Sequence, residues 1–82
     1  MELVIDSWDV IKTMSLKELK DKYKQYLKDN IIGKDITKLA YFMEKSQNTI
    51  ETYLKGEGND VWTMRLIVDF GLQIINENKD AA

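Results

Sequence analysis

Apolar residues recur every three or four positions along most of this 82-residue chain, which is the spacing of one face of an α-helix. The pattern predicts an all-α fold of four to five short helices. Only the N-terminal segment is ambiguous, because residues 3–5 fit a short strand whereas Val10, Ile11 and Met14 fit one side of a helical turn. We favour a short helix over about residues 6–13.

A longer helix is predicted directly after Ser15. Ser15 and Glu18 have the spacing of a capping box, in which each side chain bonds a backbone amide left free at the helix start. Glu18 with Lys22 and Lys17 with Asp21 are oppositely charged and four residues apart, so we expect two ion pairs. The apolar stripe of this helix consists of Leu16, Leu19, Tyr23, Tyr26 and Leu27. Its other side is rich in lysine, which fits either a solvated surface or a flank that faces phosphates.

Residues 36–56 predict two short helices joined by a tight turn. Ser46 stands where the second helix needs an N-cap, and Gly56 suits its left-handed C-terminal cap. The apolar residues of the first helix share one face, and the second helix is expected to bury three residues; in chain order they are Ile36, Leu39, Ala40 and Met43, then Ile50, Tyr53 and Leu54. This is the layout of a helix-turn-helix, whose second helix is offered to the major groove of DNA. The chain is therefore expected to be a single helix-turn-helix domain.

The stretch LAYFMEKSQNTIETYLKG, residues 39–56, resembles the Cro/Xre-type, lambda repressor-like helix-turn-helix family, whose common phrase runs roughly LAxxLGVSxNTVxxYLxG. The resemblance covers about a quarter of the chain. Glu44 replaces the usual glycine, which predicts a non-glycine residue at positive φ, and Lys45 replaces an apolar turn residue. Similar proteins are repressors or accessory regulators, often of phages or mobile elements, and bind operators with two half-sites.

The exposed side of the second helix is expected to read bases. Gln47 and Asn48 carry amides that match an adenine edge. Thr52 can touch a thymine methyl group, and Glu51 can accept from a cytosine amino group. Glu51 suits the groove only in that contact or when paired with Lys55. The residues expected to contact the DNA backbone are Lys34, Thr37, Lys38, Lys45, Ser46 and Lys55.

A final helix is predicted over about residues 60–77, with Asn59 or Asp60 as its cap and a frayed tail after it. Apolar residues occupy nearly all its sides, and a helix apolar all round must be buried all round. Because so short a monomer can hardly cover every side, we predict a homodimer. The expected interface residues are Trp62, Leu66, Phe70, Leu72, Ile74 and Ile75. A hydrophobic pocket for another protein is the alternative that leaves the same pattern.

Composition narrows the chemistry. The chain has no Cys and no His, so it lacks thiolate ligands, the commonest acid–base catalyst and the commonest zinc ligand. It also has no P-loop, GxGxxG or HExxH motif. We therefore expect no enzyme activity, no metal and no cofactor. No apolar run approaches the roughly 18 residues that span a bilayer, and the N-terminus lacks the basic start of a secretory signal, so we expect a cytoplasmic protein without a membrane partner.

The charge distribution favours DNA binding more than the net charge does. A net charge of −2 argues against a nucleic-acid binder. However, residues 12–55 hold ten lysines and six acids, whereas the flanking segments are both acidic. We therefore expect a small, dimeric, sequence-specific DNA-binding transcriptional regulator that binds double-stranded DNA. The alternative is a protein-interaction module on the same fold, such as an antirepressor that binds another regulator.

Overall fold

The computed structural model describes residues 5–81 of the chain, and the side chains of residues 5–79. This part of the chain forms five helices and no strand, which confirms the expected all-α fold. The helices are α1 (Trp8–Ile11), α2 (Leu16–Asn30), α3 (Gly33–Met43), α4 (Gln47–Leu54) and α5 (Val61–Ala81). The first helix is shorter than expected, and residues 3 and 4 of the possible strand lie outside the described residues. None of the described helices is long and apolar enough to cross a membrane.

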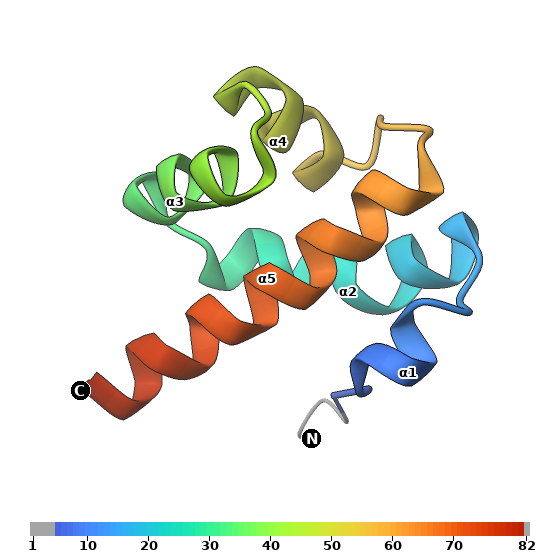
Figure 1. Ribbon diagram of the computed structural model, residues 1–82, viewed down its shortest axis with the longest axis horizontal. Helices are drawn as coiled ribbons and strands as arrows, with labels where there is room; N and C mark the ends of the chain where they lie inside the picture. Colours follow the sequence, from blue (N-terminus) through green and yellow to red (C-terminus); the bar gives the residue numbers. More distant parts are fainter. Residues whose placement is uncertain (1–4, 82) are drawn as a thin grey trace.

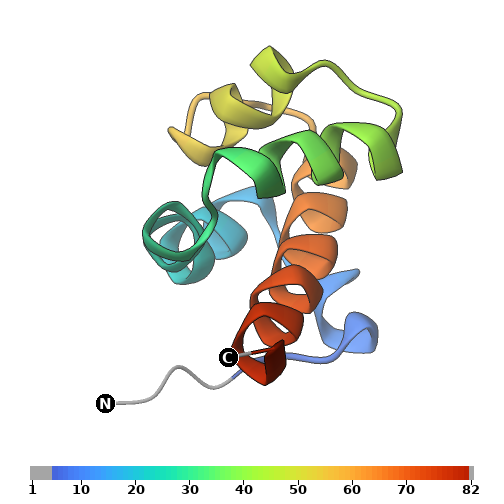
Figure 2. The same ribbon diagram turned by 90° about the vertical axis from the view of Figure 1, so that its left-hand side faces the viewer.

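The long helix α5 crosses the front of the molecule, α2 lies behind it, and α3 and α4 lie together on one side of the α5 axis (Figure 1). Seen from the side, α3 and α4 lie above α2, and α5 runs upright beside α2 and passes behind α3 (Figure 2). The core forms where α2 meets α5, and Leu19, Tyr23 and Leu27 are fully buried there. Gly71 permits this close crossing, because a Cβ at that position would lie 2.9 Å from Leu27 Cδ2. The α2–α5 layer thus supports the α3–α4 pair.

The capping box at the start of α2 is confirmed. Ser15 Oγ accepts from the amide of Glu18 at 3.2 Å, and Glu18 Oε1 accepts from the amide of Ser15 at 3.2 Å. The expected ion pair between Glu18 and Lys22 is wrong. Lys22 Nζ lies 2.7 Å from Asp6 Oδ2 instead, because Glu18 is engaged at the helix end.

The turn between α3 and α4 has the conformation expected from the family phrase. Glu44 lies in the left-handed region at φ 55° and ψ 41°. The amide of Lys45 then donates to the carbonyl oxygen of Ala40 at 3.0 Å, which closes the end of α3. Ser46 caps α4, since its Oγ accepts from the amide of Thr49 at 3.2 Å. These local bonds fix the angle between the two helices.

Two helix boundaries differ from the prediction for one reason. α3 begins at Gly33, before its expected start, and α5 continues to Ala81, where a frayed tail was expected. Asp35 is fully buried and accepts from the amide of Ile32 at 3.1 Å and from Asn78 Nδ2 at 3.3 Å. As the third residue of α3, Asp35 therefore stabilises the first turn of that helix and holds the last turns of α5 against it.

The packing of α5 corrects the expected dimer interface. Leu72, Ile74 and Ile75 are only 6%, 3% and 4% exposed, because α1, α2 and α3 all pack against α5. These three residues belong to the core of the monomer and not to a contact between copies. The expected interface residues that remain at the surface, exposed or half-buried, are Trp62, Leu66 and Phe70.

Candidate nucleic-acid interface

Helix α4 has one buried side and one bare side. Ile50, Tyr53 and Leu54 are buried, as expected, and fix the inner side in the core. The bare side is polar along its whole length, which is what a helix needs to meet base edges in the major groove. The exposed residues that form it are Gln47, Asn48, Glu51 and Lys55.

Thr52 differs from the other residues expected to read bases. It is half-buried, and its Oγ1 donates to the carbonyl oxygen of Asn48 at 2.8 Å. Its hydroxyl is therefore used within α4, and Thr52 contributes less to the bare side than expected.

Two helices meet at the start of α4. Gln47 Nε2 donates to Thr37 Oγ1 of α3 at 3.3 Å, so a residue expected to read bases touches one expected to contact the backbone. Lys34 and Lys38 are exposed on α3, one turn apart and on the same side as Thr37. The structure therefore brings Thr37 to the start of the bare side, with Lys34 and Lys38 on the same side of α3.

The turn adds two further expected backbone contacts. Lys45 and Ser46 are both exposed. The hydroxyl of Ser46 is already engaged, because it caps α4 and lies 2.9 Å from Thr49 Oγ1. Of these two residues, Lys45 is therefore the one whose side chain is more available to contact a phosphate.

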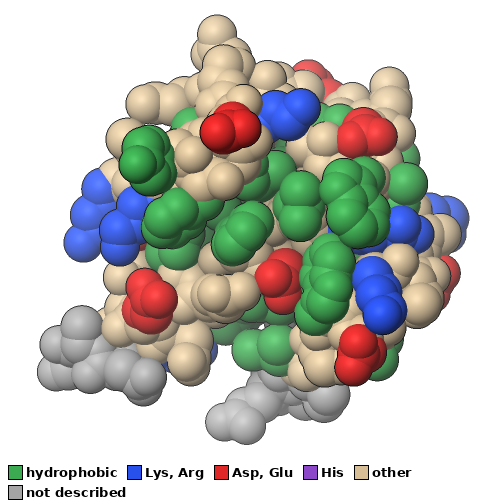
Figure 3. Space-filling view, viewed as in Figure 1, with side chains coloured by type: hydrophobic (Ala, Val, Ile, Leu, Met, Phe, Trp, Pro, Cys, Tyr) green, Lys and Arg blue, Asp and Glu red, His purple; other side chains and the backbone are tan. Residues whose placement is uncertain are grey.

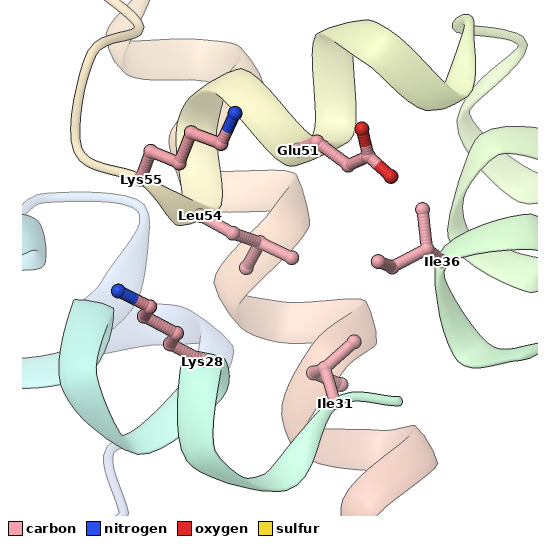
Figure 4. Close-up of a pocket in the computed structure, with 6 residues that line it drawn as sticks. All are labelled: Lys28, Ile31, Ile36, Glu51, Leu54 and Lys55. Atoms are coloured by element: carbon pink, nitrogen blue, oxygen red, sulfur yellow. The ribbon is translucent and has the colours of Figure 1, made fainter. Parts of the chain in front are cut away.

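A shallow hollow of about 180 Å³ lies between α4, the end of α2 and the start of α3 (Figure 4). It is lined by Lys28, Ile31, Ile36, Glu51, Leu54 and Lys55. The Glu51 carboxylate is directed towards Ile36, away from the amino groups of the two lysines (Figure 4). Among the described residues, no ion pair joins Glu51 to Lys55. If Glu51 lies in a major groove, its carboxylate therefore requires a hydrogen-bond donor from the DNA, such as a cytosine amino group.

Two carboxyl groups outside α4 have shifted pKa values. Hydrogen bonds from the Thr63 side chain and amide lower the pKa of Asp60, whose bond to the Thr63 amide is 2.9 Å long, as expected of the cap of α5. Hydrogen bonds from Lys22 and then Tyr23 lower the pKa of Asp6. Both shifts follow from bonds that hold helices in place. The described residues contain no group of three or more carboxylates that could hold a metal ion.

A second surface crosses the front of the molecule, where hydrophobic side chains form a band (Figure 3). We call it the aromatic face, and it consists of Trp8, Tyr41, Phe42, Trp62, Leu66 and Phe70. Trp8 and Trp62 pack edge to face with ring centres 5.8 Å apart, and Phe42 and Phe70 lie 6.0 Å apart. Tyr41 is 80%, Phe42 53% and Trp62 51% exposed. The face joins α1, α3 and α5 and includes no residue of α4.

Two lysines near the end of α4 were not predicted individually. A Cβ at Gly56 would lie 2.8 Å from Lys24 Cδ, so the stem of Lys24 passes directly beside that glycine. Lys28 lines the hollow together with Lys55. Because Lys24 and Lys28 are four residues apart, the sequence shows that they lie on the same side of α2. Only the folded structure shows that this side of α2 packs near the end of α4.

Comparison with protein-family models, with curated proteins and with solved structures finds no match to this chain.

Proposed function

We propose that the protein is a small sequence-specific DNA-binding transcriptional regulator that inserts α4 into the major groove. The observation that carries this proposal is the bare polar side of α4, which the buried Ile50 and Leu54 hold outward. Gln47 and Asn48 stand at the start of that side, and the first residues of such a helix are the ones that reach base edges. Their amides suit bidentate bonds to adenine.

The lysines around α4 support the proposal. Lys34 and Lys38 share a side of α3 with Thr37, which contacts Gln47 at the start of α4, and Lys55 lies at the other end of α4. Lysine–phosphate contacts fix the register of a protein on DNA without reading its sequence. Base preference is then left to the side chains between these lysines.

Substitution of Asn48 by Ala tests base reading. Loss of one bidentate amide contact removes roughly 1–3 kcal/mol of discrimination against the wrong base. We therefore expect a roughly 5- to 150-fold smaller ratio between binding to a selected duplex and to a shuffled one, with folding intact. Asn76→Ala is the matched control, because Asn76 is exposed on α5. An unchanged ratio for Asn48→Ala, or a wild-type protein without sequence preference, would refute the proposal.

We also propose that two copies bind one operator through the aromatic face. Trp62, Leu66 and Phe70 follow at four-residue intervals on α5, with Trp8 packed on the first and Phe42 on the last. A two-fold axis at Leu66, perpendicular to α5, sets the tryptophan pair of one copy against the phenylalanine pair of the other. This is the self-complementary contact that an isologous dimer needs. Such aromatic pairs add to the stability gained from burial alone.

The same axis agrees with DNA binding. α4 lies on one side of the α5 axis (Figure 1), so a two-fold axis perpendicular to α5 leaves both α4 helices on the same side of the dimer. The two helices would then enter half-sites about 34 Å apart, one turn of the duplex. Sedimentation tests the contact: Trp62→Glu is expected to give a monomeric mass and Trp62→Phe a dimeric one. A monomeric mass for the wild-type protein would refute the dimer.

A protein-interaction module is the second candidate function, such as an antirepressor that binds another regulator. The exposed aromatic face favours it, because large exposed apolar patches mark protein-binding sites. Salt separates the two candidates. Binding through lysine–phosphate contacts weakens steeply as salt rises, whereas an apolar contact does not.

A further inference from the structure

The lysines of α2 fall into two groups. Lys17 and Lys22 form ion pairs with aspartates, at 3.2 Å and 2.7 Å. Lys20, Lys24 and Lys28 form no ion pair with any residue that the structure describes. These three follow at four-residue intervals, so they make one row along the helix. Their ammonium groups can therefore bind an anionic group of another molecule.

Two members of this row lie at the carboxyl end of α4. Gly56, at φ 87°, terminates α4, and the stem of Lys24 lies so close that a Cβ there would be 2.8 Å from Lys24 Cδ. Lys28 and Lys55 line the same hollow from α2 and α4 (Figure 4). Three lysines therefore lie at the end of α4: Lys24 and Lys28 from α2, and Lys55, the residue that follows α4.

The length of α4 matches the width of the major groove. A helix of eight residues spans about 12 Å, which matches the roughly 12 Å width of the major groove. When α4 lies in the groove, each of its ends approaches one sugar–phosphate strand. Lys34 and Lys38 stand at the first end, and the cluster of three stands at the other.

We infer that Lys24 and Lys28 bind backbone phosphates together with Lys55, so that α2 forms part of the DNA-binding surface. This inference rests on the proposed function. Because phosphate contacts carry no sequence information, these lysines add affinity on every duplex and leave base preference to α4.

The test is the salt dependence of binding to a selected and to a shuffled duplex. Each phosphate contact contributes about 0.9 to the slope of log K against log salt concentration. Lys24→Gln with Lys28→Gln is expected to lower the slope by roughly twice that amount, equally on both duplexes. Lys17→Gln is the matched control, because Lys17 lies on the same helix but is paired with Asp21. Lys24→Arg with Lys28→Arg is expected to keep the wild-type slope.

The other outcomes overturn either this inference alone or the proposed function as well. A steep wild-type slope that the double glutamine variant leaves unchanged overturns this inference and spares the proposed function. A slope that neither the glutamine nor the arginine pair retains also overturns it, because the charge is then not what matters. A wild-type protein whose DNA binding does not depend on salt overturns the proposed function, and this inference with it.

Discussion

Tyr23 shows how one buried side chain ties the N-terminal segment to the core. Its hydroxyl donates to Asp6 Oδ2 at 2.7 Å and accepts from the Asp6 amide at 2.9 Å. Lys22 Nζ donates to the same carboxylate oxygen at 2.7 Å. Helical periodicity predicted that Tyr23 is buried but gave no partner for its hydroxyl, because Asp6 lies outside α2.

Asp6→Asn is expected to destabilise the protein at neutral pH and much less in acid. Lys22, then Tyr23, lowers the pKa of the folded Asp6 carboxyl. Its contribution to the free energy of unfolding is therefore complete above the unfolded pKa, about 3.9, and is lost as the pH falls through the lower folded value. Urea unfolding of both proteins at about pH 7 and about pH 2 measures this.

The control for that measurement is Asp9→Asn. Asp9 is exposed and lies 3.4 Å from Lys12, and such surface pairs contribute little. We expect Asp6→Asn to have a lower free energy of unfolding than the wild type at about pH 7 and a similar one at about pH 2. Asp9→Asn is expected to match the wild type at both pH values. An equal gap at both pH values would contradict the role given to the charge of Asp6.

Glu44→Gly is expected to raise the free energy of unfolding by up to about 1 kcal/mol. A left-handed residue with a Cβ costs roughly 1–2 kcal/mol, and Glu44 sits at φ 55°. Glycine removes that cost but loses more backbone entropy on folding. The net gain in the free energy of unfolding is therefore smaller than the cost that is removed. Glu44→Ala keeps the Cβ and should give no such gain. Equal urea midpoints for the glycine and alanine variants would argue against strain at this position.

At the scale of helices, local signals were predictable and distant ones were not. Ser15 and Ser46 cap α2 and α4 as expected, because a cap and its partner lie three residues apart. The true start of α3 and end of α5 were missed, because they depend on the contact between Asp35 and Asn78. These residues are 43 positions apart, and no short-range pattern records such a contact.

Asp35→Ala is expected to lower the free energy of unfolding by about 1–3 kcal/mol, since it removes a buried carboxylate and leaves the amide of Ile32 without its acceptor. Asn78→Ala should cost about 1 kcal/mol. The double variant should cost less than the sum, because both changes remove one contact. Asn76→Ala, at an exposed position of α5, is the control. Strictly additive losses in urea unfolding would mean that the two helices are not coupled here.

At the scale of the whole molecule, the pattern of one helix could not show what covers it. The apolar residues of α5 indicated burial correctly, but Leu72, Ile74 and Ile75 are covered by the same chain and not by a second copy. The bare side of α4 was predictable, because its polar residues repeat at helical spacing. The meeting of Lys24 with Gly56 was not, because it depends on how α2 and α4 pack.

The aromatic face and α4 are expected to act together on an operator with two half-sites. If the dimer holds both α4 helices on one side, the second helix binds at a high effective concentration, which increases affinity by about 10²- to 10⁴-fold. Trp62→Glu should lose this gain on a duplex with two half-sites and keep wild-type affinity for a single one. Trp62→Phe is the control.

Spacing provides an independent check of the same geometry. Inserting about five base pairs between the half-sites turns one of them to the far side of the duplex, since one turn takes about 10 base pairs. The wild-type protein should then bind as weakly as Trp62→Glu, and an insertion of about ten base pairs should restore part of the gain. Titrations of labelled duplexes measure all of these affinities. If neither insertion changes the affinity of the wild-type protein, the two copies do not bind one duplex as a rigid dimer. That conclusion holds even if sedimentation gives a dimeric mass.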